Sequence, residues 1–449
     1  MQKQSTAVLG NGNIRRLLTR YSIPAIIAMT ASSLYNLTDS IFIGKGVHHL
    51  ALSGLTVTFP FMNLAAAFGS MVGIGASTLI SIKLGQKDYR LANRILGNVL
   101  VLNILIGIFL TVAFLPFLDH VLYFFGASDS TIVYARDYMK IILLGNVVTH
   151  MYFGLNAVLR SAGFPNLSMY ITLISVAVNC IVTPIFIFVF GWGIQGSALA
   201  TILSQVVSLA VQFICLSKRQ HVIHFQKGIY RLHRKLVSNI LYIGMSPFLM
   251  NACACLIVIL ITRGFREHGG DIAVAAYGMV NRIVFIFVMI IMGLNQGMQP
   301  IAGFNYGAGN YRRVTEVTRL TIICAISVAT LGFLVCELFP DAILHLFTSH
   351  TALLDEARYG LRIVFIVFPI VGFQMVASNF FMSIGQSKMA IFLSLTRQVL
   401  FLIPCLLLLP RFLEITGIWI SIPVADSVSS IVTALVLFRY MKRWLVISD

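Results

Sequence analysis

One carboxylate stands inside an otherwise apolar stretch near the beginning of the chain. Residues 33–46 read SLYNLTDSIFIGKG, in which Tyr35, Asn36 and Asp39 are spaced i, i+1 and i+4 and can share one helix face. An ionised carboxylate in such surroundings costs several kcal/mol unless it is paired or hydrated. The pattern therefore indicates a protonatable or cation-binding group. The alternative is a structural acid near the end of a membrane span that reaches the lipid head groups.

Three further polar residues are candidates to complete a site with Asp39. Asn179 and Thr183 lie one helical turn apart, and Thr201 adds a hydroxyl from the next apolar segment. Hard cations prefer several oxygen ligands and more charge than one carboxylate supplies. The set therefore predicts a proton site or a weak Na⁺ site. Helix–helix hydrogen bonding is the alternative role for Asn179 and Thr183.

The second half of the chain places three charged residues, Arg282, Arg397 and Asp426, inside apolar segments. A lone buried charge would be costly, so we expect an Arg–Asp pair. Such a pair is predicted to be a structural lock, with a second coupling site as the alternative.

Composition assigns the chain to the integral membrane proteins. Of its 449 residues 58% are hydrophobic and only 10% are charged, whereas a soluble protein has about 25% charged residues. The net charge of +17 comes mostly from short connections between apolar stretches, so membrane topology and lipid head groups explain it better than nucleic acid does. The seven cysteines all fall in apolar segments and predict neither a disulfide framework nor a metal site.

The apolar stretches predict twelve transmembrane helices, because a bilayer span needs about 20 apolar residues. They cover roughly 21–44, 52–80, 93–118, 134–161, 167–191, 193–217, 237–263, 273–300, 316–339, 357–384, 389–410 and 417–441. These runs are too long for the alternating pattern of a membrane β-barrel. The predicted fold class is therefore an all-α polytopic membrane protein.

Charge asymmetry predicts how these spans are oriented. Basic residues cluster at both ends of the chain and in every second connection, whereas acids such as Asp119 and Asp341 occupy the other connections. By the positive-inside rule both termini are expected to be cytoplasmic. The longest inner connection, residues 218–236, is predicted to lie as a basic amphipathic linker along the inner leaflet. It divides the chain into an amino-terminal lobe, residues 1–217, and a carboxy-terminal lobe, residues 237–449, of six helices each.

The two halves are weak repeats of one another. A shift of 222 positions aligns Gly75 with Gly297 and Tyr89 with Tyr311, within LGQKDYR against YGAGNYR. Both copies begin on the same side of the membrane, so the repeat is parallel. Transporters built in this way place the substrate route between two bundles that rock against each other.

Several motifs resemble those of the multidrug and toxic compound extrusion (MATE) transporters, in the branch of bacterial multidrug exporters. They are Tyr35-Asn-x-x-Asp39-x-x-Phe-x-Gly44, GASTLISIKLGQKDY, Asn179-x-x-x-x-Pro184 with GWGIQGSALAT, and NQGMQPIAGFNYGAGNYRRV with SLTRQVLFLIP. The resemblance covers nearly the whole chain. It implies two pseudo-symmetric six-helix bundles in a V shape, in a monomer of the bacterial inner membrane. It also implies export of organic cations driven by inward flow of H⁺ or Na⁺, without a cofactor.

The resemblance also extends to individual positions. Tyr138 and Asn156 are similar to family positions near the amino-lobe cavity. Tyr138 is predicted to belong to the coupling site, and Asn156 and Asn179 are predicted to line the substrate cavity; ordinary packing is the alternative role for Tyr138 and Asn156. Family members often carry a second acid at the position of Thr183, before the proline retained here as Pro184, which is expected to bend its helix. This departure argues against Na⁺ coupling.

The carboxy-terminal lobe also departs from some family members, which carry acids in spans seven and ten. This chain has Asn251 and Gln374 as the polar residues there. Asp39 is therefore predicted to be the single carboxylate on which amino-lobe coupling rests.

Taken together, these features predict a secondary transporter, not an enzyme. The leading hypothesis is alternating-access export of amphipathic organic cations in exchange for H⁺ or, less favoured, Na⁺. The alternative is a flippase for a lipid-linked oligosaccharide or another amphipathic lipid, in which buried Arg282 and Arg397 would bind pyrophosphate. No nucleophile motif, His–Glu metal motif or phosphate loop supports an enzyme.

Overall fold

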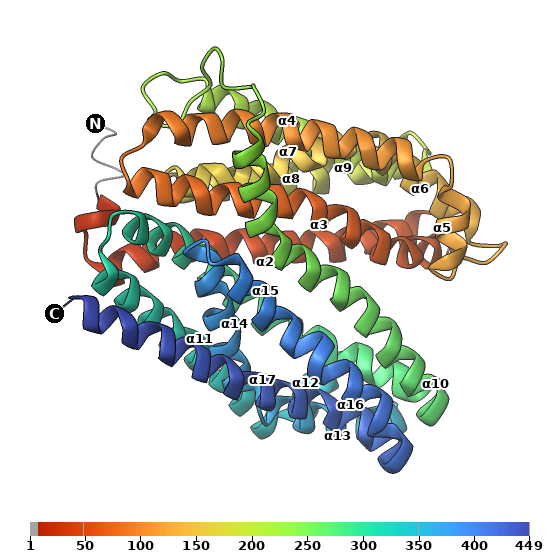
Figure 1. Ribbon diagram of the computed structural model, residues 1–449. Coiled ribbons are helices and arrows are strands. Elements are labelled where there is room, and N and C mark those ends of the chain that lie inside the picture. Colours follow the sequence, from red (N-terminus) through yellow and green to blue (C-terminus); the bar gives the residue numbers. More distant parts are fainter. Residues whose placement is uncertain (1–7, 48, 349, 449) are drawn as a thin grey trace. The chain divides into compact units, whose positions relative to one another are not determined.

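The computed structural model describes residues 8–47, 49–348 and 350–448, without the side chains of residues 36, 37, 45, 49, 52 and 443–448. In this part of the chain the regular elements are helices (Figure 1). The prediction of an all-α fold is therefore confirmed.

The first half of the chain forms eight α-helices and one π-helical turn. They are α2 (Ile14–Gly46), α3 (His49–Gly85), α4 (Tyr89–Phe114), α5 (Leu118–Phe124), α6 (Ile132–Leu144), α7 (Asn146–Ser161), α8 (Pro165–Pro184), the π-turn η1 (Ile185–Val189) and α9 (Gly193–Leu216).

The second half repeats this order of long, short and bent helices. It contains α10 (Arg234–Gly307), α11 (Tyr311–Leu338), α12 (Pro340–Leu344), α13 (Thr351–Phe365), α14 (Phe368–Ser383), α15 (Ser387–Leu395), the π-turn η2 (Thr396–Leu402), α16 (Ile403–Leu408) and α17 (Pro410–Ser448).

Twelve spans account for these helices. Among the described residues nine helices are long and apolar enough to cross a membrane, and two bent pairs, α6–α7 at 57° and α13–α14 at 51°, raise the number to eleven. Helix α10 has 74 residues and is broken at Gly270, whose φ is 64°. Because a span needs about 20 residues, α10 contains two spans, and the predicted number of twelve is reached.

The chain divides into two compact units that differ from the predicted lobes at two places. Unit 1 contains Ile27–Phe248, and unit 2 contains Gly12–Ile26 together with Leu249–Asp449. Residues 12–26 were expected in the amino-terminal lobe and 237–248 in the carboxy-terminal lobe. Each unit therefore includes the beginning of the helix that continues into the other unit.

Close backbone packing explains this exchange. In unit 1, a methyl group on Gly75 would collide with the carbonyl oxygen of Ile240, and one on Gly244 would collide with that of Met71. In unit 2, a methyl group on Gly297 would collide with Ser22. The shift of 222 relates Gly75 to Gly297 and Ser22 to Gly244, so both units use the same tight helix crossing.

The repeat also reproduces an ion pair. Arg136 donates to Asp119 at 2.6 Å in unit 1, and Arg358 donates to Asp341 at 2.7 Å in unit 2. Both residues of the second pair lie 222 positions after those of the first. The weak sequence similarity between the halves therefore reflects equivalent three-dimensional positions.

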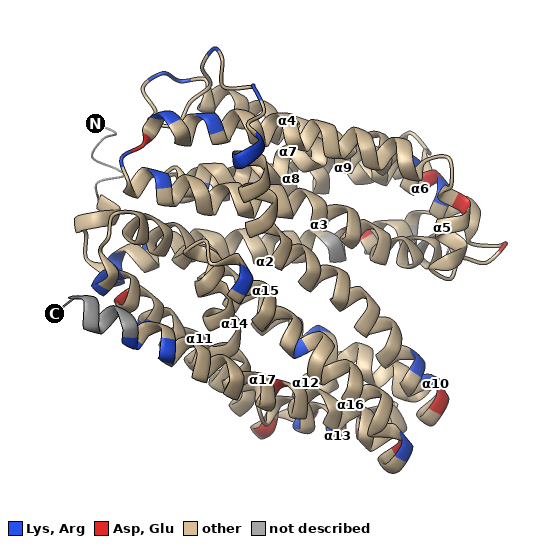
Figure 2. Ribbon diagram, in the orientation of Figure 1, with Lys and Arg blue, Asp and Glu red and all other residues tan. Residues whose placement is uncertain are grey.

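The linker between the two sets of spans packs against the first unit. Residues 217–233 consist of turns and irregular chain, and they fold back along the start of α4 (Figure 1). Their predicted position along the inner leaflet stays a prediction. Figure 2 shows Lys and Arg gathered around this linker and the start of α4, whereas most acids of unit 1 lie near α5 and α6. Basic and acidic residues thus lie at opposite ends of unit 1, as the charge asymmetry of the sequence predicts.

The glycine crossing in unit 1 makes a prediction about stability. Gly75→Ala should lower the free energy of unfolding by about 1–3 kcal/mol, because the added methyl group forces two helix backbones apart. Gly278→Ala is the matched control, since nothing lies within 4 Å of the added carbon. Thermal unfolding of the purified proteins in detergent measures both, and equal melting temperatures would contradict the close crossing.

Candidate functional site

The Asp39 carboxylate lies inside unit 1 and is held by one hydroxyl group. Asp39 is on α2, and only 5% of the residue is exposed. Ser197 on α9 lies within hydrogen-bond distance of both carboxylate oxygens, at 2.8 and 2.9 Å. The carboxylate is therefore both withdrawn from solvent and bonded, which satisfies the condition for keeping it inside a membrane span.

Thr201 connects this carboxylate to the other predicted residues. Its hydroxyl is 2.9 Å from the Tyr35 hydroxyl. It accepts a hydrogen bond from Asn179 Nδ2 at 3.3 Å and donates one to the backbone carbonyl of Ser197 at 3.1 Å. Because a hydroxyl donates only one hydrogen bond, Tyr35 is the donor toward Thr201. Residues from α2, α8 and α9 thus converge on one turn of α9.

Thr183 joins the site indirectly. Its hydroxyl donates to Asn179 Oδ1 at 3.1 Å and is fully buried. The structure therefore brings together Tyr35, Asp39, Asn179, Thr183 and Thr201, as their spacing predicts. The described contacts of Asn179 and Thr183 are hydrogen bonds between polar side chains.

Ser197 is the residue that the sequence analysis missed. It lies one turn before Thr201, in GWGIQGSALAT, so the i, i+4 spacing was a signal available in the sequence. Small hydroxyl residues also pack membrane helices, and this common role concealed the contact with Asp39.

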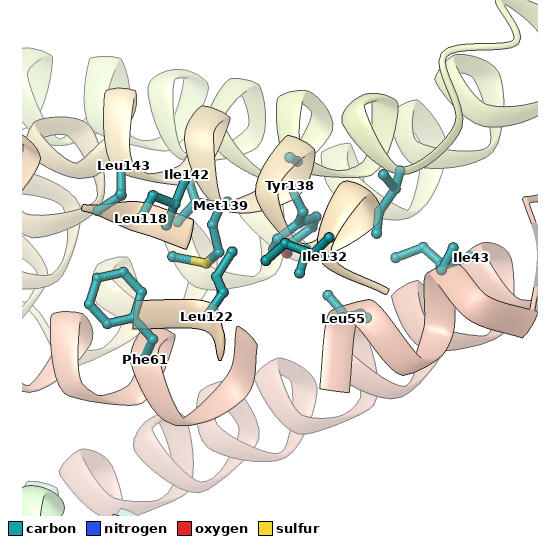
Figure 3. Packing of buried hydrophobic residues seen from close by; sticks show 14 of the residues in the cluster. Ile43, Leu55, Phe61, Leu118, Leu122, Ile132, Tyr138, Met139, Ile142 and Leu143 are labelled. Carbon is teal, nitrogen blue, oxygen red and sulfur yellow. The ribbon is translucent and has the colours of Figure 1, made fainter. Parts of the chain in front are cut away.

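Two other predicted residues of this lobe do not bond the carboxylate directly. Tyr138 on α6 is 2% exposed; its hydroxyl lies close to Thr201 and Asp39, and its ring packs in a cluster of apolar side chains that includes Ile43, Leu55 and Met139 (Figure 3). The side chain of Asn36 lies outside the described residues. The roles predicted for these two residues stay predictions.

Asn156 on α7 belongs to a separate polar network. Its Nδ2 donates to Thr172 at 3.0 Å, and its Oδ1 accepts a short hydrogen bond from Ser168. Arg160 also donates to Ser168, at 3.4 Å. This network joins α7 to α8.

A cavity of about 240 Å³ lies beside the Asp39 network within unit 1. It is lined by Ser32, Tyr35, Phe59, Met62, Asn63, Ala65, Ala66, Ile142, Asn146, Thr149, Tyr152, Phe153, Ser175, Val176, Thr201, Ser204 and Gln205. Asp39, Asn156 and Asn179 are not among the lining residues. Tyr35 and Thr201 belong to both cavity and network, so they connect the buried carboxylate to the cavity.

Pro184 stands at a change in helix geometry. Helix α8 ends at Pro184, and the π-turn Ile185–Val189 follows immediately. Proline cannot donate the hydrogen bond that continues an α-helix, and π-turns are a recognised cause of bends. The irregular turn begins two residues after Thr183, at the edge of the network.

Unit 2 contains the predicted Arg–Asp pair. Arg397, in η2, donates to Asp426 at 2.5 Å, and Asp426 is 4% exposed. Arg282 is exposed on α10, and no salt bridge joins it to an acid among the described side chains. A flippase would need both arginines to bind pyrophosphate together. Here Arg397 is neutralised by Asp426, whereas Arg282 is exposed, so the two do not form a common anion site.

A family model described as MatE matches residues 24–185 and 246–407, which together make up more than half of the chain. The chain belongs to the MatE family. The resemblance found from its motifs is confirmed, and the two matched segments are related by the same shift of 222 residues. The chain is thus a multi-pass membrane transporter of this family.

Similar proteins cover nearly the whole chain. The multidrug export protein MepA of Staphylococcus aureus (strain MRSA252) is 27% identical over 432 residues, 95% of this chain and 94% of MepA. The solved structure of the MATE multidrug transporter DinF-BH is 32% identical, with a TM-score of 0.89 and 96% coverage of each chain. An outward-facing MATE family transporter of the MOP superfamily is 24% identical, has a TM-score of 0.92 over 99% of each chain, and shares the fold.

The MatE repeat allows the two units to be compared position by position. The shift of 222 relates Asp39 to Ile261, Ser197 to Trp419 and Tyr138 to Gly360. Trp419 is fully buried, and its ring occupies the space that a side chain on Gly360 would need. The position of the carboxylate and its hydroxyl partner is therefore apolar core in unit 2.

The same comparison explains the charged pair of unit 2. Ser175 and Ser204 line the cavity of unit 1 and are 3.4 Å apart. Their equivalents at a shift of 222 are Arg397 and Asp426. An ion pair thus stands where unit 1 has two small hydroxyl residues beside a cavity.

The Arg397–Asp426 pair should behave as a structural lock. Arg397→Gln should cost about 1–3 kcal/mol, because it leaves a buried carboxylate without its partner. Asp426→Asn should cost less, since the Arg397 side chain is 31% exposed and that of Asp426 only 6%.

The double variant R397Q/D426N should recover part of the loss, because neither charge then remains unpaired. Thermal unfolding in detergent measures all three variants. A double variant whose loss equals the sum of the single losses would show that the two side chains are not energetically coupled.

Proposed function

We propose that this MatE transporter exports amphipathic organic cations, including drugs, in exchange for protons, and that unit 1 couples the two movements. The observation that carries the proposal is the position of Asp39, buried against Ser197 and connected by Thr201 and Tyr35 to the cavity. The relative MepA is a multidrug export protein. The membrane is proposed to be the bacterial inner membrane, with both termini in the cytoplasm.

The cavity lining suits hydrophobic cations of varied shape. Tyr35, Phe59, Tyr152 and Phe153 supply aromatic rings, and Met62 supplies a flexible thioether. Aromatic faces attract cations, and methionine adapts to irregular surfaces. The lining includes amide and hydroxyl groups but no carboxylate, so its affinity for a cation depends on charge placed nearby.

Protonation of Asp39 would change that nearby charge. The ionised carboxylate accepts a hydrogen bond from Ser197, whereas the protonated group is itself a donor, so the Ser197 hydroxyl must re-orient. Thr201, one turn further along α9, donates to the backbone carbonyl of the same Ser197 and contacts Tyr35, which lines the cavity. A proton on Asp39 therefore weakens cation binding by removing a negative charge close to the cavity. Such a difference between states is what coupling requires.

A proton suits this site better than Na⁺ does. Sodium needs several oxygen ligands around it, but Thr183 and Asn179 are hydrogen-bonded to each other and to Thr201 instead of to Asp39. One carboxylate with one hydroxyl is a sufficient site for a proton. Unit 2 offers no equivalent, because Ile261 and Trp419 occupy the corresponding positions.

Asp39→Asn should abolish proton-driven transport without abolishing substrate binding. In proteoliposomes with an imposed pH gradient, efflux of a fluorescent cation should fall to the rate of protein-free liposomes. Binding of the same dye in detergent should be weaker than in the wild type but still detectable, because asparagine removes the nearby negative charge as protonation does, whereas the residues that line the cavity are unchanged. Asp271→Asn is the matched control, since the Asp271 side chain is 94% exposed and its loss should change neither measurement.

Two results would contradict this proposal. Retained gradient-driven efflux in Asp39→Asn would remove the coupling role of the carboxylate. A response of the wild-type protein to a sodium gradient alone would replace the proton as the coupling ion.

Filling the cavity should weaken substrate binding directly. Ala66→Phe places a ring among the lining residues and should weaken binding of a bulky dye while leaving the fold intact. Ala275→Phe on the exposed side of α10 is the control for an added ring in a membrane span. Fluorescence anisotropy of the dye measures both variants, and unchanged binding in Ala66→Phe would place the substrate elsewhere.

A further inference from the structure

The linker between the two sets of spans is fastened to α4 by two buried asparagines. Asn93 is 4% exposed and Asn98 is fully buried. Asn93 donates to the carbonyl of Val222 at 2.9 Å and accepts from the backbone of His224 at 2.8 Å. Asn98 donates to the carbonyl of Arg231 and accepts from the backbone of His233, both at 3.2 Å. Each side-chain amide thus binds the linker backbone through one donated and one accepted hydrogen bond, as the backbone of a neighbouring β-strand would.

Packing reinforces these two clamps. Ile223 and Ile229 of the linker are buried, and a methyl group on Gly97 would collide with the carbonyl oxygen of Ile229. Phe225 stacks on Phe213 of α9 with ring centroids 5.4 Å apart. The linker is therefore a folded part of unit 1 and not a loose tether, so its side chains have defined positions.

Two adjoining depressions lie between this linker and the start of α4. One, of about 450 Å³, is lined by Tyr89, Arg90, Asn93, Gln220, His221, Val222, His224 and Gln226. The other, of about 370 Å³, is lined by Arg219, His224, Phe225, Gln226, Lys227 and Tyr230. His224 and Gln226 belong to both depressions, so the two adjoin, and together we call them the linker hollow.

The linker hollow is cationic. Arg90, Arg219 and Lys227 line it, and no acid is among its lining residues. The nearby Asp88 is engaged in capping α4, where it accepts from the backbone of Leu91 at 3.0 Å. Figure 2 shows the concentration of basic residues at this end of unit 1. The hollow therefore favours an anion.

Apart from Val222, the remaining lining residues carry hydrogen-bonding groups or aromatic rings. His224 directs Nδ1 to the His221 carbonyl at 2.6 Å and places Nε2 3.0 Å from Gln226, so its ring is held in place. Burial, together with the positive charges of Lys218 and His224, lowers the pKa of His221 below its usual value. Arg90, Arg219 and Lys227 thus supply the positive charge of the hollow that does not depend on histidine protonation.

We propose that the linker hollow binds the phosphate group of an anionic phospholipid. Tyr89 is the first residue of a membrane-spanning helix, so the hollow lies where that helix leaves the hydrocarbon, at the depth of the head groups. Arginine and lysine bind phosphate through charge-assisted hydrogen bonds. Tyrosine is enriched at membrane–water interfaces, and Tyr89 and Tyr230 both line the hollow. This site is independent of the transport reaction, so its test uses binding alone.

The experiment measures lipid binding to the full-length protein by native mass spectrometry after delipidation. Phosphatidylglycerol is the probe, phosphatidylcholine with the same acyl chains is the zwitterionic comparison, and inorganic phosphate is the competitor. We expect selective retention of phosphatidylglycerol that millimolar inorganic phosphate does not reverse. Equal retention of phosphatidylcholine, or full competition by inorganic phosphate, would overturn the assignment to an anionic lipid.

Matched variants locate the bound lipid. R90Q/R219Q/K227Q should bind phosphatidylglycerol roughly 100-fold more weakly, since each basic residue near an anionic lipid contributes about a fivefold gain. R312Q/R439Q/K442Q removes three exposed basic residues of unit 2 and should bind as the wild type does. Equal losses in both triple variants would overturn the specific site.

A single substitution separates binding from folding. Arg90 lies on α4 and not in the linker, so Arg90→Gln should leave the melting temperature unchanged and weaken phosphatidylglycerol binding about fivefold. Unchanged affinity in Arg90→Gln would remove this residue, and with it the proposed hollow, as the lipid site.

Discussion

The cost of keeping a carboxylate inside a membrane span is the constraint on which the polar interior of unit 1 depends. Asp39 is 5% exposed and is stabilised by the hydroxyl of Ser197. That contact requires α2 and α9 to lie against each other at one defined turn, and Thr201 on the next turn then recruits Tyr35 and Asn179. Because each partner is itself buried or partly buried, the network holds together only as a whole. Tyr35 and Thr201 of this network also line the cavity, so the buried charge of Asp39 lies close enough to affect a molecule bound there.

The two units show how one backbone frame supports two different interiors. The glycine crossings and the Arg–Asp pairs near α5 and α12 recur at a shift of 222 residues. Inside that shared frame, Tyr138 and Ser197 of unit 1 are replaced by Gly360 and Trp419 of unit 2, a reciprocal exchange of large and small residues. Trp419 donates to Glu356 at 2.8 Å and fills its space, while Arg397 and Asp426 occupy the positions of two cavity-lining serines. Unit 1 therefore retains a cavity and a carboxylate where unit 2 has core and an ion pair.

Helical periodicity explains why much of the site was predictable. Tyr35 and Asp39, or Asn179 and Thr183, lie on one helix face wherever the helix packs, so their spacing alone predicted a shared site. The Arg397–Asp426 pair followed from the cost of an unpaired charge. The contact of Ser197 with Asp39, the lining of the cavity and the network of Asn156 were not predicted, because each depends on which helix faces are opposed. The linker illustrates the same limit: its basic residues indicated a segment at the inner leaflet, but they gave no sign that Asn93 and Asn98 of α4 bind its backbone.

The sequence by itself determined the membrane class, the number of spans, the internal repeat and the single carboxylate of the first lobe. These follow from apolar run length, charge distribution and spacing, which are properties of the chain read locally. Only the tertiary structure decided that Ser197 is the partner of Asp39, that Trp419 fills the equivalent place, and that each unit includes the beginning of the other's helix. Those outcomes depend on contacts between residues far apart in the chain, such as Asp39 with Ser197 at a separation of 158 positions, and such contacts are set by packing between helices, which no local pattern encodes.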